Sequence, residues 1–118
     1  MFKRLFGKSD APASASSVDV TEAQRRLASR EALLIDVREP DEWQEGHVAG
    51  ARHIPLGDLP ARLAEVPRDR PVLLLCRSGN RSGRATALLR EQGYDQATNV
   101  AGGITAWQRA GLLVTRGK

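Results

Sequence analysis

Residues 73–89 read LLLCRSGNRSGRATALL. An unbroken apolar run leads into Cys76, a short polar segment follows, and apolar residues then recur at helical spacing. A continuous apolar run is typical of a strand buried on both faces, whereas the later spacing indicates an amphipathic helix. We therefore predict a strand over 71–75, a tight loop after Cys76, and a helix over 82–92 that Gly93 ends.

Strand and helix patterns alternate on both sides of this stretch. Further apolar runs predict strands at 33–37, 52–54 and 97–100. Helical patterns lie between and around them: one capped by Thr21, one opened by Pro40, a weak one over 56–66, and one after Gly102 that contains Trp107. Such alternation predicts an α/β domain with a central, mostly parallel sheet.

Composition places the chain among soluble globular proteins. It has 118 residues, 41% of them hydrophobic and 27% charged, which suits one domain with one core. No apolar run approaches the ~20 residues that cross a bilayer, and the basic start MFKRLFGK lacks the apolar region of a signal peptide. A single cysteine cannot form an intramolecular disulfide, so we expect a reducing compartment, the cytoplasm.

The net charge of +4 does not indicate a nucleic-acid partner. The arginines are interleaved with acidic residues along the chain, whereas nucleic-acid binders usually cluster basic residues with exposed aromatics. His47 and His53 have no recognised metal-ligand spacing, so we predict structural roles for them and expect neither a metal nor another cofactor.

Residues 1–17 differ in composition from the rest. Ser, Ala, Pro and Asp dominate 9–17, which is typical of a linker, and we place the folded domain at 18–118. Phe2, Leu5 and Phe6 lie at helical spacing beside basic residues. Two interpretations stay open for residues 2–8: a disordered tail, or a short amphipathic contact with a membrane surface or a partner.

The position of Cys76 predicts a reactive thiol. Ligands of parallel α/β sheets bind beyond the carboxyl ends of the strands, where Cys76 would lie. Gly79 permits a tight curl, and the backbone N–H groups of the loop and the next helix would then surround the sulfur. Together with the cations of Arg77 and Arg81, they would favour the thiolate. The alternative is an inert core cysteine, but the polar residues that follow it disfavour that interpretation.

Four segments, in order along 32–113, resemble the rhodanese-like sulfurtransferases. They are Leu34-Ile35-Asp36-Val37-Arg38; Glu42-Trp43 with Gly46-His47-Val48, Gly50-Ala51 and His53-Ile54-Pro55; Cys76-Arg77-Ser78-Gly79-Asn80-Arg81-Ser82; and Gly102-Gly103-Ile104 with Ala106-Trp107. This resemblance implies the rhodanese-like fold, with a five-stranded sheet flanked by helices.

The resemblance also implies a persulfide mechanism of the thiosulfate sulfurtransferase type. Cys76 would take the outer sulfur of thiosulfate or of a persulfide donor and pass it to cyanide, a thiol or a sulfur-accepting protein. The loop that binds the donor and the persulfide would consist of Arg77, Ser78, Gly79, Asn80, Arg81 and Ser82. Asp36 and Arg38 would support the turn beside it.

Two other functions stay open. A binding module could use the same fold to recognise a partner or act in a sulfur relay, although it would not need the thiol. A cysteine-dependent phosphatase or arsenate reductase uses Cys-x5-Arg spacing, whereas Arg81 is only five positions after Cys76. The shorter loop predicts a ring that suits a sulfur atom better than a phosphoryl group.

Overall fold

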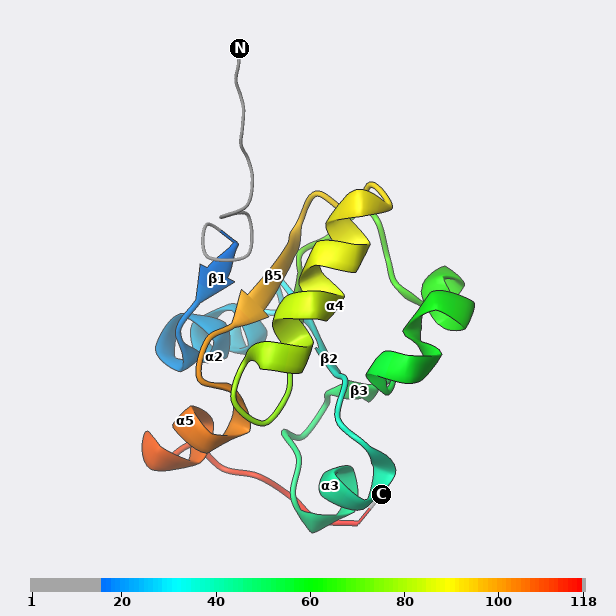
Figure 1. Ribbon diagram of the computed structural model, residues 1–118. Helices are drawn as coiled ribbons and strands as arrows, with labels where there is room; N and C mark the ends of the chain where they lie inside the picture. Colours follow the sequence, from blue (N-terminus) through cyan, green and yellow to red (C-terminus); the bar gives the residue numbers. More distant parts are fainter. Residues whose placement is uncertain (1–15, 118) are drawn as a thin grey trace.

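The computed structural model describes residues 16–117, and its centre is one sheet of five parallel strands (Figure 1). The strands are β1 (Ser17–Val18), β2 (Leu33–Asp36), β3 (Arg52–His53), β4 (Val72–Leu75) and β5 (Ala97–Val100). They lie in the order β1-β5-β4-β2-β3, and every neighbouring pair is parallel. The predicted α/β class and the five-stranded sheet are confirmed.

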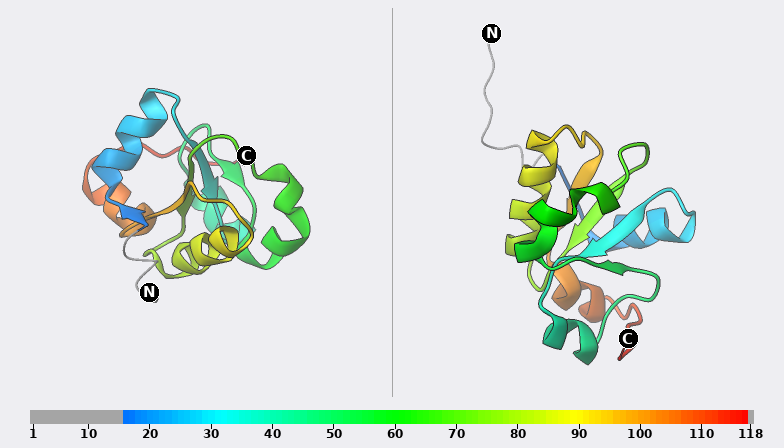
Figure 2. Two further views of the ribbon diagram at one scale, coloured as in Figure 1. Left: turned by 90° about the horizontal axis from the view of Figure 1, so that it is seen from above. Right: turned by 90° about the vertical axis from the view of Figure 1, so that its right-hand side faces the viewer.

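Helices cover both faces of the sheet (Figure 2). They are α2 (Val20–Ala28), α3 (Pro40–Glu45), the 3-10 helix η1 (Leu56–Glu65), α4 (Asn80–Glu91) and α5 (Gly103–Arg109). One hydrophobic cluster joins the sheet to α4 and η1, and a second joins it to α2 and α5. The sheet is therefore the middle of three layers, as parallel sheets require when both faces are apolar.

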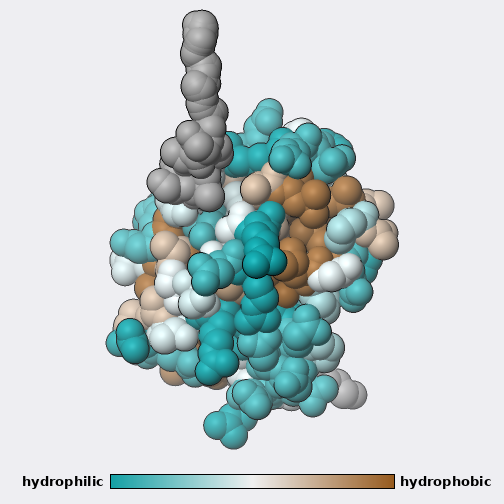
Figure 3. Space-filling view, viewed as in Figure 1, coloured by the Kyte–Doolittle hydropathy of each residue, from teal (hydrophilic) through white to brown (hydrophobic). Residues whose placement is uncertain are grey.

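Strand β4 shows why the apolar run before Cys76 has no polar alternation. All four of its residues are buried. Val72 and Leu74 belong to the cluster under α4, whereas Leu73 and Leu75 belong to the cluster under α2 and α5. On the α4 side, the surface between α4 and η1 is hydrophobic in Figure 3, where partly buried leucines of both helices pack against the core.

Two predicted helix starts were wrong. Helix α4 begins at Asn80 rather than at residue 82, because Gly79 takes a left-handed φ of 109° and serves as its N-cap. Asp19, not Thr21, caps α2, since the Asp19 carboxylate accepts a hydrogen bond of 2.9 Å from the backbone N–H of Glu22. In both cases a turn residue just outside the apolar pattern starts the helix.

The folded domain also begins earlier than predicted. Ser17 pairs with Asn99 in β1, and the carbonyl of Ser16 accepts a 2.7 Å hydrogen bond from the backbone N–H of Asn99. Both serines lie in the stretch 9–17, whose composition predicts a linker. The predicted contact of residues 2–8 with a membrane or partner lies outside the described residues. Within residues 16–117, no helix is long and apolar enough to cross a membrane.

The sheet register brings three strand ends to one edge. Asp36 at the end of β2 lies opposite Leu75 at the end of β4, and Leu74 lies opposite Asn99 in β5. The loop that begins at Cys76 therefore emerges between the ends of two neighbouring strands. This edge faces α3 and the start of α5 in Figure 1.

Candidate active site

Cys76 lies at the carboxyl end of β4, and the loop after it curls around its sulfur. The residue is only 1% exposed. The backbone N–H of Gly79 lies 3.1 Å from Cys76 Sγ, and the Ser82 hydroxyl oxygen lies 3.2 Å from it. A backbone N–H of the loop and a hydroxyl in the first turn of α4 thus converge on one sulfur, which is the arrangement expected from the short spacing.

Helix α5 holds the first peptides of this loop. The backbone N–H of Ile104 donates 2.9 Å to the carbonyl of Cys76, and that of Thr105 donates 3.2 Å to the carbonyl of Arg77. Gly103 permits this approach, because a side-chain carbon there would collide with the carbonyl of Arg77. The glycine pair before α5 therefore allows a close contact with the active-site loop.

Hydrogen bonds make the thiol more acidic than an ordinary cysteine. Burial raises the pKa of the Cys76 thiol, but the Ser82 hydroxyl and the backbone N–H groups of Ser82, Gly79 and Ser78 outweigh burial, so that the pKa is lowered. Donors that stabilise the charged form have this effect. The loop therefore favours a thiolate, the reactive form of cysteine.

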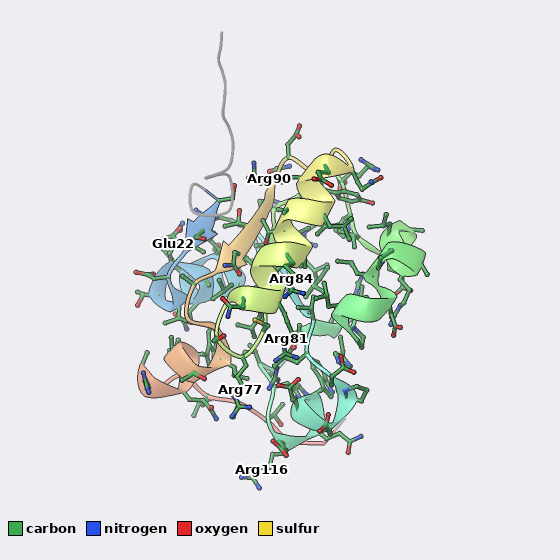
Figure 4. The ribbon with its side chains drawn as sticks, viewed as in Figure 1. Glu22, Arg77, Arg81, Arg84, Arg90 and Arg116 are labelled. Atoms are coloured by element: carbon green, nitrogen blue, oxygen red, sulfur yellow. The ribbon has the colours of Figure 1, made fainter. Side chains whose placement is uncertain are left out.

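The two arginines of the loop differ in their surroundings. Arg81 forms a bidentate ion pair with Glu42 of α3, with N–O distances of 2.7 and 2.9 Å. This pair lowers the pKa of Glu42 to about 2, with the Arg81 hydrogen bond as the largest cause. Arg77 is exposed and has no ion pair among residues 16–117. Figure 4 shows both arginines near the start of α4, whereas Arg90 lies near the other end of the helix.

The ion pair corrects one sequence-based expectation. The sequence predicts that both arginines supply cations beside the sulfur, but in the structure the charge of Arg81 is shared with Glu42, 39 residues earlier. Arg81 still interacts electrostatically with Cys76. The hydrogen bonds of the loop, rather than free cations, are the main reason for the lowered thiol pKa.

Asp36 and Arg38 form a buried ion pair at the same edge. The Arg38 guanidinium donates to both carboxylate oxygens of Asp36 at 2.8–3.1 Å. It also donates to the carbonyls of Glu42 and Gly46, at 3.2 and 2.7 Å. Arg38 therefore fixes α3 against the end of β2, and α3 in turn places Glu42 beside Arg81.

A hollow of about 240 Å³ lies beside the loop. Arg77, Thr105 and Gln108 line one part of it, and Glu42 and Glu45 of α3 line another. Its lining is mostly polar and carries both charges, so it offers room for a small ion next to the exposed guanidinium of Arg77.

Comparison with known proteins identifies the family of the chain. Residues 19–110 match the family model of the rhodanese-like domain. The chain belongs to the rhodanese-like sulfurtransferases. It is 43% identical to a sulfurtransferase of Allochromatium vinosum, over 84% of this chain and 94% of the relative.

Solved structures support the same family. A rhodanese-related protein of Thermoplasma volcanium is 29% identical, with a TM-score of 0.78 over 84% of this chain and 96% of that one. The human single-domain sulfurtransferase TSTD1 is 30% identical, with a TM-score of 0.71 over 80% of this chain and 96% of that one.

The two histidines of this rhodanese-like domain stack on Trp43. The ring of His47 lies 3.6 Å from it and that of His53 lies 4.8 Å away, while His53 Nε2 lies 2.7 Å from the carbonyl of Arg38. Across residues 16–117, no three His, Cys, Asp or Glu side chains are grouped so as to hold a metal ion. Through Trp43, which belongs to α3, both histidines pack against this helix.

The sequence interpretation missed Asn99. This side chain belongs to β5, and it reaches both the Gly79 carbonyl and the Ser82 hydroxyl. Of the other predicted loop residues, Asn80 opens α4 and Ser78 contributes its backbone N–H. The sequence did offer a signal for Asn99, because it is a polar residue within the predicted strand 97–100. An amide side chain inside a buried strand needs hydrogen-bond partners.

Proposed function

We propose that this protein transfers sulfane sulfur from thiosulfate or a persulfide donor to a thiophilic acceptor, with Cys76 carrying the sulfur as a persulfide. The observation that carries the proposal is the convergence of the Gly79 N–H and the Ser82 hydroxyl on Cys76 Sγ. A lone thiol of this kind works in a reducing compartment such as the cytoplasm. The persulfide is formed on the protein itself, so we propose no cofactor.

In the first step the Cys76 thiolate attacks the outer sulfur of thiosulfate. A bond forms between Cys76 Sγ and that sulfur, and the sulfur–sulfur bond of thiosulfate breaks, so that its electron pair leaves with sulfite. The negative charge then lies on the outer sulfur of the persulfide. The backbone N–H groups of the loop are already oriented, so they stabilise this charge without rearrangement.

In the second step an acceptor attacks the outer sulfur and regenerates the thiolate. Cyanide would leave as thiocyanate, and a thiolate would leave as a persulfide. The exposed guanidinium of Arg77 beside the 240 Å³ hollow provides a cation for the anionic donor. Arg81 contributes less to donor capture in this scheme, because Glu42 neutralises it.

The geometry disfavours phosphatase or arsenate chemistry. Arg81 follows Cys76 by five positions rather than six, so the loop is one residue shorter than Cys-x5-Arg spacing and its N–H donors enclose less space than a tetrahedral oxyanion needs. A binding module without chemistry would need neither the thiol nor the hydrogen bonds that lower its pKa.

Mass spectrometry of the intact protein before and after incubation with thiosulfate tests the proposal. We expect one added sulfur atom, which cyanide or dithiothreitol removes. Cys76→Ser should gain none and should have no measurable thiosulfate:cyanide activity, because Cys76 is the only cysteine. Since Ser is nearly isosteric with Cys, its far-UV circular dichroism and melting curve should match the wild type.

A wild-type protein that gains no sulfur from either thiosulfate or a small-molecule persulfide would overturn the proposal. If it gains sulfur only from the persulfide, thiosulfate is not its donor. Persulfide formation in Cys76→Ser would show that the sulfur is bound elsewhere.

A further inference from the structure

Asn99 connects the two sides of the active-site loop. It lies in β5 and is 7% exposed. Its Nδ2 donates 3.2 Å to the carbonyl of Gly79, and its Oδ1 lies 2.6 Å from the hydroxyl oxygen of Ser82. Gly79 and Ser82 are the two residues whose groups also reach Cys76 Sγ.

The chemistry of these groups determines which way the amide points. A carbonyl oxygen can only accept, so the NH₂ group of Asn99 must face Gly79, and its oxygen must face Ser82. That oxygen can only accept as well, so Ser82 must be the donor. The Ser82 hydroxyl has one hydrogen, which is aimed either at Asn99 Oδ1 or at Cys76 Sγ, but not at both.

We propose that Asn99 is a positioning residue that competes with Cys76 for the hydrogen of the Ser82 hydroxyl. The inference rests on the proposed function, in which the Cys76 thiolate is the nucleophile. While Cys76 is a neutral thiol, its S–H donates to Ser82 Oγ and Ser82 donates to Asn99. When the thiol proton leaves to solvent, Ser82 keeps its own proton and turns toward the sulfur.

This turn leaves Asn99 Oδ1 without its donor. Ser82 is fully buried and Asn99 nearly so, and a buried oxygen that loses its hydrogen bond is unfavourable. Asn99 therefore opposes formation of the resting thiolate. In the persulfide the charge lies on the outer sulfur, so Ser82 can turn back to Asn99. Ser82 and Asn99 together thus favour the persulfide of Cys76 over its free thiolate.

The loop and the elements beside it also carry charged groups. They are Arg77 of the loop, Arg81 of α4 with its partner Glu42 of α3, and the buried pair Asp36–Arg38 at the end of β2. None of them bonds to the Asn99 side chain. A comparison of variants that change only Asn99 and Ser82 therefore leaves these charges in place.

The test is a double-mutant cycle on the pKa of Cys76. The variants are Asn99→Leu, Ser82→Ala and the double variant, each titrated by the ultraviolet absorbance of the thiolate. The effect of Asn99→Leu on the pKa of Cys76 is measured twice, once with Ser82 present and once in the Ser82→Ala background. The change in pKa with Ser82 present should be more negative than the other change by about one unit. Leu is similar in size to Asn but has no acceptor oxygen. It also removes the hydrogen bond to the Gly79 carbonyl, but that loss occurs in both backgrounds and cancels in the difference.

Equal changes in the two backgrounds, or a difference of opposite sign, would overturn the proposal and leave Asn99 as a support for the loop. If Asn99→Leu does not fold, Asn99→Ala removes the same oxygen with less bulk, and the same difference is expected. No sulfur donor enters the titration. Failure here is therefore separate from failure of the proposed sulfur transfer, which mass spectrometry measures.

Discussion

At the scale of single residues, a cysteine becomes acidic here through neighbours that carry no charge. Burial opposes ionisation of Cys76, and hydrogen bonds from Ser82 and from the backbone of the loop reverse that effect. Arg81, which interacts electrostatically with Cys76, is neutralised by Glu42. Hydrogen-bond donors held in place by the backbone therefore stabilise a thiolate without an unpaired cation beside it.

The rate of Cys76 alkylation by iodoacetamide should therefore depend on pH with a midpoint below the ~8.5 of a free thiol. Below this midpoint the thiol is protonated and reacts slowly; above it the thiolate reacts. Ser82→Ala should move the midpoint to higher pH, whereas Arg77→Ala should move it much less, because Arg77 is exposed. Stopped-flow alkylation of the three proteins measures this. A larger shift of the midpoint for Arg77→Ala than for Ser82→Ala would mean that the charge of Arg77, rather than the hydrogen bonds, is the main cause of the low pKa of Cys76.

At the scale of elements, the start of α5 and the active-site loop are held together. Gly103 lies against the carbonyl of Arg77 with a φ of 59°, and the next two N–H groups of α5 bond to the loop. A side chain at this position would both strain the backbone and push the loop away from α5.

Gly103→Ala should lower the free energy of unfolding by about 1–3 kcal/mol and lower sulfur-transfer activity as well. The matched control is Gly57→Ala in η1, where an added carbon meets nothing within 4 Å and φ is not positive. Urea unfolding and thiosulfate:cyanide kinetics of both variants measure the difference. Equal stability of the two would mean that the loop and α5 can separate freely.

The length of the loop is a second property at this scale. One glycine inserted between Gly79 and Asn80 restores Cys-x5-Arg spacing and widens the ring. Because a displacement of about 1 Å at a reacting centre can lower a rate ~100-fold, sulfur transfer should fall by about that factor. Phosphate binding, measured by calorimetry, should rise.

A glycine inserted between Asp69 and Arg70, in an exposed bend, is the control for this insertion. This control insertion should leave both sulfur-transfer activity and phosphate binding near those of the wild type. Undiminished sulfur transfer after the insertion in the active-site loop would show that ring size does not select the chemistry.

At the scale of the whole molecule, the site depends on the sheet that assembles it. The short edge strand β1 pairs with β5, and the backbone of Asn99 bonds to Ser16 while its side chain reaches the loop. The site is thus connected through β5 to the start of the folded domain.

Deletion of residues 1–15 should leave thiosulfate activity within a few-fold of the full chain, because every predicted site residue lies beyond them. Deletion of 1–17 should lower the melting temperature and activity further, since it also removes the partners of Asn99 at this edge. Co-sedimentation with anionic vesicles, full chain against the 1–15 deletion, tests the membrane interpretation of residues 2–8. Equal partitioning would reject it.

Local patterns in the sequence were enough for four of the five strands and for the position of Cys76 at a strand end. The apolar run over 71–75 predicted a strand buried on both faces, because burial on both faces leaves no polar alternation. The tight curl that Gly79 permits is present in the structure, where this residue takes a φ of 109° that is open mainly to glycine. The position of Cys76 at a strand end and the short loop after it followed from neighbours in the chain.

Tertiary structure alone decided which distant groups meet at the sulfur. Glu42 reaches Arg81 across 39 residues, and Asn99 reaches Ser82 across 17, because the register of β4 with β5 and the position of α3 bring them together. Sequence periodicity reports which face of an element is buried. It does not report which side chain on another element will neutralise a charge or accept a hydrogen bond, since that depends on how the finished layers pack.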